Sequence, residues 1–180
     1  DQGTTNSKAL LLDETGRIVK KASAPVAVSY PQPGWVEQSG LDIWQSVQTV
    51  ARQCLAAADG TAIAAIGISN QRESVLIWDR HTGEPIGPSI TWQCRRSAAP
   101  IAAVRTPAIE RRVDAITGLG LDPLFPAAKI AWLLDAHPDA RALAARGELC
   151  AGTIDSWLVF KLTGGKLHAT LLGSGTILRE

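Results

Sequence analysis

The chain opens on a polar turn that leads directly into an apolar stretch. Asp1 is followed by a glycine, by small hydroxyl and amide side chains and by Lys8, and residues 9–12 are all apolar. Such a turn can point backbone N–H groups and hydroxyls at one anion. The acid could reach that anion through a divalent metal, and the lysine could contact it as a point charge. The turn therefore predicts a site for nucleotide phosphates, although hydroxyl-rich turns of purely structural role are common between strands.

The composition excludes several classes of protein. The 180 residues are 46% hydrophobic and 19% charged, which is ordinary for a globular protein. The net charge of +1 gives no electrostatic basis for binding nucleic acid or an anionic membrane. The sequence has no apolar run long enough to span a bilayer and no signal-peptide pattern. Its scattered cysteines fit neither a disulfide framework nor a zinc motif, so we expect a cytoplasmic protein without nucleic-acid or membrane partners.

The first half of the chain predicts a hairpin, a long helix and a buried strand. Residues 7–13 and 18–28 predict two strands joined by a turn that contains a glycine. Ser39 can cap a helix that runs to about Asp59. Residues 63–69 form a continuous apolar run, which is typical of a strand buried on both faces. The predicted inner face of the helix consists of Leu41, Trp44, Val47, Ala51, Leu55 and Ala58.

The second half predicts short strands and several helices. Residues 74–79 and 90–92 have strand patterns. Helical patterns follow, interrupted by prolines and glycines, and the clearest covers residues 127–136. Thr153 or Asp155 can cap a last helix that ends at a Gly-Gly pair. This order of elements predicts an α/β fold with a mixed sheet flanked by helices.

A polar break, Asn70–Glu73, follows the predicted buried strand at its carboxyl end. Ligands collect at that edge in open α/β sheets. Arg72 and Glu73 offer a fork of donors beside a two-oxygen acceptor, which suits a vicinal diol or polyol. Trp92 could form a wall of the same site, because an indole stacks on C–H faces and donates one hydrogen bond. The alternatives are a solvated Arg–Glu pair and a tryptophan that only packs in the core.

Other reactive residues form no recognisable motif. His81, His137 and His168 have no second ligand at metal spacing. Ser69 and Ser156 lack a nucleophile elbow, and no Gly-x4-Gly-Lys-Ser/Thr loop is present. We expect these three histidines to be structural or solvated.

Several stretches of the chain resemble, in the same order, the FGGY family of carbohydrate kinases. Together they cover nearly the whole chain up to Thr170. The stretches are Asp1–Thr5, Tyr30–Glu37, Gly67–Glu73, Thr91–Gln93 with Arg95–Arg96, Thr117–Leu119 with Asp122–Pro123, and Gly152–Leu158 with Lys161–Gly165.

The resemblance implies a ribonuclease H-like, actin-like ATPase domain, the first of two that close around a cleft. Residues 1–170 would form this polyol-binding domain, with its first strand clipped before Asp1, and residues 171–180 depart from the family pattern. A C-terminal nucleotide domain with the catalytic base would lie outside the chain. The implied reaction of the intact protein is ATP-dependent phosphorylation of a hydroxyl of glycerol or a related polyol, and the fragment alone would be inactive. The resemblance also implies a homo-oligomer, either a dimer or a tetramer.

The same resemblance implies roles for single residues, with ATP and Mg²⁺ as cofactors. Asp1 would help to hold Mg²⁺. Because phosphoryl transfer needs in-line positioning and charge neutralisation, we expect the opening turn and the Arg72–Glu73 pair to face one crevice. The implied polyol-binding residues are Gln71, Arg72, Glu73 and Trp92. The implied phosphate contacts are Thr4, Thr5, Asn6 and Lys8.

Three positions depart from the family pattern. Leu124 stands where we expect a Tyr that contacts glycerol, so the exact polyol stays open. Cys94 replaces an Asp. Lys8 replaces an Arg, which keeps the charge but loses the planar fork of donors.

Two other functions remain open. A non-catalytic sugar sensor or scaffold would have the same actin-like fold, and the changes at Leu124 and Cys94 would suit it. A hydrolase with paired carboxylates would use Glu73 and Asp79, but these residues follow one another along one stretch of chain without separate acid and base environments.

Overall fold

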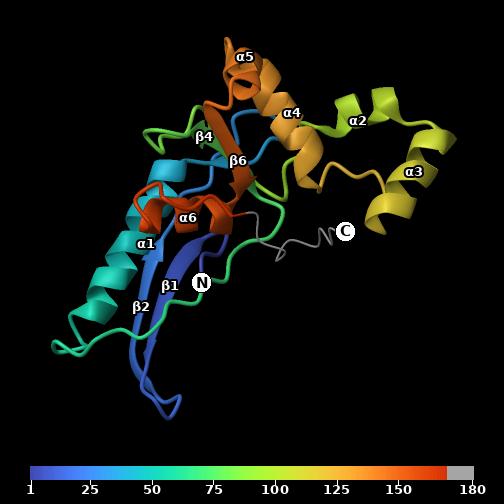
Figure 1. The fold of residues 1–180 in the computed structure, drawn as a ribbon. Helices are drawn as coiled ribbons and strands as arrows, with labels where there is room; N and C mark the ends of the chain where they lie inside the picture. Colours follow the sequence, from blue (N-terminus) through green and yellow to red (C-terminus); the bar gives the residue numbers. More distant parts are fainter. Residues whose placement is uncertain (170–180) are drawn as a thin grey trace.

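The computed structural model describes residues 1–169, which form an antiparallel hairpin, a four-stranded sheet and the helices that cover them (Figure 1). The strands are β1 (Asn6–Leu12), β2 (Ile18–Pro25), β3 (Glu37–Gln38), β4 (Val75–Asp79), β5 (Ser89–Ile90) and β6 (Leu149–Thr153). The helices are α1 (Gly40–Leu55), α2 (Ala98–Val104), α3 (Pro107–Thr117), α4 (Pro126–Ala136), α5 (Ala140–Ala145) and α6 (Ile154–Leu162).

The hairpin of β1 and β2 confirms the first predicted pair of strands. Asp13 Oδ1 accepts hydrogen bonds from the backbone N–H groups of Thr15 (2.9 Å) and Arg17 (3.0 Å). Gly16 takes the positive φ, +81°, that the turn requires. Asp and Gly are favoured in tight turns for these two reasons, so local chemistry is sufficient to place the turn.

The four-stranded sheet has the order β3-β5-β4-β6, and each neighbouring pair is antiparallel. Side chains of β4 alternate between two cores. Leu76 and Trp78 pack with Trp157 of α6 on one side. Val75 and Ile77 join the second core with Leu133 of α4. The α/β class is confirmed, whereas parallel pairing in the described residues is limited to one bridge, between Gln2 and Asn70.

The predicted inner face of α1 is only partly right, since Trp44 and Val47 are partly buried and pack against the core. Ser39 caps the helix as predicted, but the buried positions are Gly40, Ile43, Ser46, Val50 and Cys54. Leu41 and Leu55 are about half exposed, at 49% and 53%. Because α1 packs on the hairpin, whose facing residues include Ala22 and Ala24, small side chains allow the closest approach. The Ser46 hydroxyl also bonds the Ser7 hydroxyl across this contact, at 2.7 Å.

The predicted buried strand at residues 63–69 is not found. This segment has no strand pairing, and Ile63 and Ile66 are 39% and 72% exposed. Backbone bonds join this region to Gln2 alone: Gln2 N–H donates to Ser69 O, and Gln71 N–H donates to Gln2 O. A strand needs a ladder of such bonds along its length. In the described residues, backbone bonds form only at the carboxyl end of the segment.

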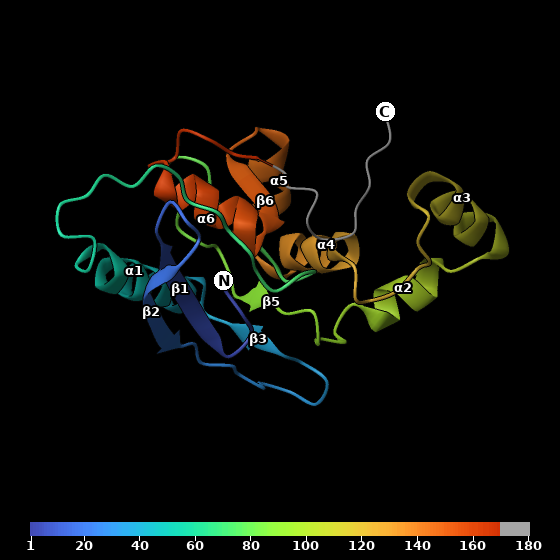
Figure 2. The same cartoon turned by 90° about the horizontal axis from the view of Figure 1, so that it is seen from below.

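Helices α2 and α3 project from the body of the molecule (Figures 1 and 2). Helix α3 has no buried residue. Within residues 1–169, no helix is both long and apolar enough to cross a membrane.

Candidate functional site

The opening turn is a closed hairpin end. Asp1 and Lys8 exchange two backbone hydrogen bonds, of 2.8 and 2.7 Å, and Gly3 N–H donates to Asn6 O at 2.9 Å. A Cβ at Gly3 would lie 3.2 Å from Asn6 O, so glycine suits this tight approach. The geometry leaves the hydroxyl and amide side chains of residues 4–6 at the tip of the turn.

The Arg72–Glu73 turn lies directly beside this hairpin end. Gln2 N–H donates to Ser69 O at 2.8 Å, and Gln71 N–H donates to Gln2 O at 2.7 Å. The Arg72 side chain is exposed, whereas Glu73 is buried and holds a positive φ of 64°. A non-glycine residue in this region carries backbone strain, which accumulates at functional sites.

Trp92 connects the same two segments. Its indole Nε1–H donates to Thr4 Oγ1 at 3.0 Å, and its backbone N–H donates to Ser74 Oγ at 3.0 Å. The side chain remains 43% exposed. The structure therefore brings together the opening turn, the Arg–Glu turn and an indole that is accessible to solvent.

Glu73 and Lys129 form a buried pair of charges behind this surface. Lys129 is fully buried, and its Nζ donates to Glu73 O at 2.8 Å and to Leu124 O at 2.6 Å. Burial lowers the pKa of Lys129 to about 8, against attraction by Glu73. Burial raises the pKa of Glu73, while the positive charges of Lys129 and Arg72 oppose the rise. Glu73 Oε2 is buried and has no hydrogen-bond partner among residues 1–169.

Sequence reasoning did not identify Lys129. Its position does carry a signal, since it lies four residues before Leu133, on the face of α4 that is buried. A lysine on the apolar stripe of a helix is expected only where its ammonium group finds partners.

Two of the three replaced positions, Leu124 and Cys94, lie close to this pair. Leu124, where a Tyr was expected, is partly buried and offers its carbonyl to Lys129. Cys94 is buried, and its Sγ accepts a hydrogen bond from Arg96 Nε at 3.0 Å. Neither side chain has a strong hydrogen-bonding group to offer a polyol.

Gln71 differs from its predicted neighbours because its side chain is directed inward. It is 7% exposed, and its amide bonds the amides of Gln2 and Gln38 and the hydroxyl of Ser74. Both N–H groups of the amide are used in these bonds.

Asp155 lies in the first turn of α6 and is not its cap, because Thr153 occupies the N-cap position and makes no side-chain capping bond. Its Oδ1 accepts from the Asn70 amide at 3.1 Å and from the hydroxyl of Thr153, the residue that occupies the N-cap position of α6. The carboxylate therefore joins the start of α6 to the Gln2–Asn70 bridge. The aspartate and the threonine are both buried, whereas Asn70 is partly buried.

Donors for phosphate and metal are present at the opening turn. Asp1, Thr5 and Lys8 are exposed, and the side chains of Thr4 and Asn6 are partly so. No cluster of three or more His, Cys, Asp or Glu side chains that could hold a metal occurs in the described part of the chain. A single carboxylate suits Mg²⁺, which commonly takes one or two carboxylates and completes its shell with phosphate oxygens and waters.

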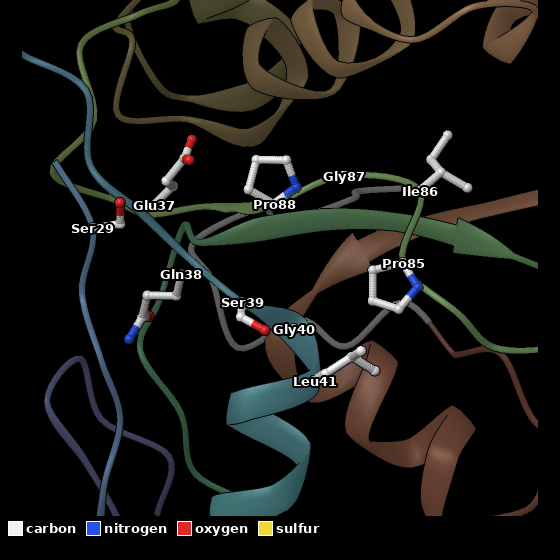
Figure 3. Close-up of a pocket in the computed structure, with 10 residues that line it drawn as sticks. All are labelled: Ser29, Glu37, Gln38, Ser39, Gly40, Leu41, Pro85, Ile86, Gly87 and Pro88. Carbon is white, nitrogen blue, oxygen red and sulfur yellow. The ribbon is translucent and has the colours of Figure 1, made fainter. Parts of the chain in front are cut away.

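Two pockets lie elsewhere in the described part of the chain. One, of about 500 Å³, is bounded by Ser39 and Gly40 at the start of α1 and by the Pro85–Pro88 segment (Figure 3). The other, of about 410 Å³, lies between α1 and residues 25–27. Neither is lined by Arg72, Glu73 or Trp92. Arg72 and Trp92 are exposed outside these pockets, whereas Glu73 is buried.

The fold and this surface together define a class: an actin-like, ribonuclease H-like α/β domain whose first hairpin turn meets an Arg–Glu pair. Residues 1–175 match the sequence family described as the FGGY family of carbohydrate kinases, N-terminal domain. The chain belongs to this family.

Relatives and a solved structure agree with that assignment. The chain is 50% identical over 172 residues to the glycerol kinase of Methylibium petroleiphilum. The aligned residues cover 94% of this chain and 34% of that protein. It is 48% identical, over 94% of the chain and 35% of the relative, to the glycerol kinase of Shewanella oneidensis. The structure of Plasmodium falciparum glycerol kinase with ADP matches with a TM-score of 0.84 and 29% identity, over 91% of this chain and 33% of that one. The chain thus spans about a third of the length of the relatives it matches.

Proposed function

We propose that the protein to which this chain belongs is an ATP-dependent kinase that phosphorylates a hydroxyl of glycerol or a related polyol. The observation that carries the proposal is the hydrogen bond from the Trp92 indole to Thr4. It joins the residues proposed to bind the polyol to the opening turn, which is proposed to bind phosphate. The similarity to glycerol kinases supports the same conclusion.

The proposed polyol site consists of Arg72, Glu73 and Trp92. The Arg72 guanidinium donates to polyol oxygens. Glu73 Oε2, which is buried and unpartnered among residues 1–169, accepts from a hydroxyl once ligand binding exposes it. The exposed face of the Trp92 indole packs against the C–H groups of the same molecule. A buried carboxylate with an unpartnered oxygen gains most from such a ligand, because its desolvation cost is already present.

The proposed phosphate site is the opening turn. Thr4, Thr5 and Asn6 contact phosphate oxygens, and Lys8 contributes a positive charge at the end of the turn. Asp1 is proposed to ligate Mg²⁺. Bound ATP supplies the phosphoryl group and bound Mg²⁺ neutralises its charge, while the chain's part is to hold polyol and phosphate at a fixed separation.

Further features of the whole protein are part of the proposal. Because the chain spans about a third of its relatives, the catalytic base and most adenine contacts are proposed to lie outside residues 1–180, so that this piece alone is inactive. The proposed partners are a small polyol or sugar and a second copy of the chain, as a cytoplasmic dimer or tetramer.

A coupled assay of ADP release by the full-length protein tests the proposal. Glycerol, erythritol and xylulose are compared, and ADP release is expected to rise with one of them. Binding of a polyol without turnover would instead support the sugar sensor, for which the residues at 94 and 124 are the observations in favour.

Arg72→Ala tests the substrate site. We expect it to lower polyol-dependent kcat/KM by roughly 100-fold, because charge-assisted hydrogen bonds to the substrate are lost, while ATP binding is kept. Arg111→Ala, at an exposed position on α3, is the matched control and should behave like the wild type. Unchanged turnover in Arg72→Ala would reject the assignment of this residue.

A further inference from the structure

Three buried glutamines connect the segments of the proposed site. Gln2 and Gln38 are each 1% exposed, and Gln71 is 7% exposed. They come from the opening turn, from β3 and from the Arg72–Glu73 turn, which are far apart in sequence. Burying an amide is costly unless its hydrogen-bonding groups are satisfied, so these three side chains need partners within the protein.

Gln71 lies at the centre of the network. Its Nε2 donates to Gln2 Oε1 at 2.9 Å and to Gln38 Oε1 at 2.8 Å. Its Oε1 accepts from Ser74 Oγ at 2.8 Å. Both amide hydrogens and the amide oxygen are therefore used within the protein.

The outer ends of the network reach the proposed binding groups. Gln2 Nε2 donates to Gly3 O at 2.8 Å. Gln38 Nε2 donates to Thr4 O at 2.8 Å and to Ala27 O at 3.2 Å. At the opposite end, Ser74 Oγ accepts from the backbone N–H of Trp92 at 3.0 Å.

Only one orientation of the three amides satisfies all these partners. The Trp92 N–H can only donate, and the carbonyls of Gly3 and Thr4 can only accept. Donation therefore runs in one direction, from Trp92 through Ser74 and Gln71 to the backbone of the opening turn. Reversing Gln2 or Gln38 would place two oxygens face to face at a backbone carbonyl and two N–H donors face to face at Gln71. Reversing Gln71 would place its oxygen against the amide oxygens of Gln2 and Gln38.

We propose that Gln71, together with Gln2 and Gln38, is a positioning residue that sets the separation between the polyol surface and the phosphate turn. The proposal rests on the kinase function proposed above. The sequence motif predicted Gln71 as a ligand of the polyol. In this proposal it is not a ligand, because its amide is directed away from the surface and is already bonded. Loss of the network would keep the binding side chains but shift their positions relative to one another. A displacement of about 1 Å can cost roughly 100-fold in rate.

The test compares Gln71→Met with Gln45→Met in the full-length protein. Gln45 is an exposed residue of α1 outside the network, so its replacement controls for loss of an amide. We expect Gln71→Met to lower kcat about 10-fold or more, with KM for polyol and for ATP changed less than roughly 3-fold. Gln45→Met should match the wild type in both constants.

Ser74→Ala provides a second variant with a smaller change in volume, which serves if Gln71→Met does not fold. It removes the link between Trp92 and Gln71. The double variant should lose no more than roughly 2-fold beyond Gln71→Met alone, because both substitutions break the same chain of bonds. Losses that multiply would mean that the two residues act independently and would overturn the network.

Hydrogen exchange of the Trp92 backbone amide is the readout that does not depend on activity. Exchange should be faster in Gln71→Met and Ser74→Ala than in the wild type and Gln45→Met. If exchange responds but no polyol supports turnover in the wild type, the kinase proposal fails and the network stands. A raised polyol KM at unchanged kcat, or a lower unfolding temperature with wild-type kinetics, would overturn the positioning role.

Discussion

At the scale of single residues, burial decides the chemistry of the site. Lys129 and Glu73 have opposite charges and lie close together. Burial nevertheless lowers the pKa of Lys129 and raises the pKa of Glu73, so that it favours the neutral form of each. The ammonium group of Lys129 is held by two carbonyls, those of Glu73 and Leu124. This lysine therefore fastens the Arg72–Glu73 turn to the loop that precedes α4.

Lys129 predicts a pH dependence of stability. Its pKa is about 8 in the folded chain and 10.5 in a free side chain, so the unfolded chain binds more protons between these values. Stability should therefore rise with pH across this window, by up to about 1.4 kcal/mol per pH unit. Urea unfolding of the wild type and of Lys129→Met at pH 7, 8.5 and 10 measures the effect. Parallel curves for the two proteins would contradict it, because all other titrating groups are common to both.

At the scale of elements, caps and turns follow local rules even where packing does not. The N-cap Ser39 accepts from Asp42 N–H, and the helix starts where the sequence predicts. The buried face of this helix is not the one that its large apolar residues Leu41 and Leu55 predict, because both are about half exposed. The buried face that packs on the hairpin includes Ser46, Val50 and Cys54, against Ser7, Ala22 and Ala24.

Ser39→Ala should destabilise the chain by about 1 kcal/mol, because the N–H of Asp42 loses its acceptor. Ser29→Ala is the control, since Ser29 lines the same pocket as Ser39 and lies outside any helix. Chemical unfolding of the two variants compares them directly. An equal loss in both would mean that the cap contributes nothing specific.

At the scale of the whole molecule, helix α1 makes a close approach to the four-stranded sheet at Gly40. A Cβ at Gly40 would lie 2.8 Å from Pro85 Cγ and 3.2 Å from Leu76 Cδ1. Contacts this short cannot be met without movement of partly buried Pro85 or of buried Leu76. The glycine therefore permits the approach of two elements that are distant in sequence.

Gly40→Ala should destabilise the chain by about 1–3 kcal/mol through overpacking, although helix propensity alone predicts a small gain. Gly67→Ala is the matched control, because a Cβ at Gly67 meets no atom within 4 Å. The midpoints of thermal unfolding measure both changes. A stabilised Gly40→Ala variant would show that the contact with Pro85 relaxes freely.

The sequence alone determines the local features of this protein. The Asp13–Gly16 turn, the Ser39 cap and the family motifs depend on residues close together in the chain, so their patterns can be interpreted without a structure. The α/β class follows from the order of these local elements.

Tertiary structure decides whatever depends on a partner from elsewhere in the chain. The apolar run at residues 63–69 has the composition of a strand but finds pairing only near Gln2. Lys129 and the three glutamines are polar residues whose burial depends on donors and acceptors from distant segments. A pattern of residues records what each side chain prefers, whereas hydrogen bonding and packing require two surfaces, and only the fold brings them together.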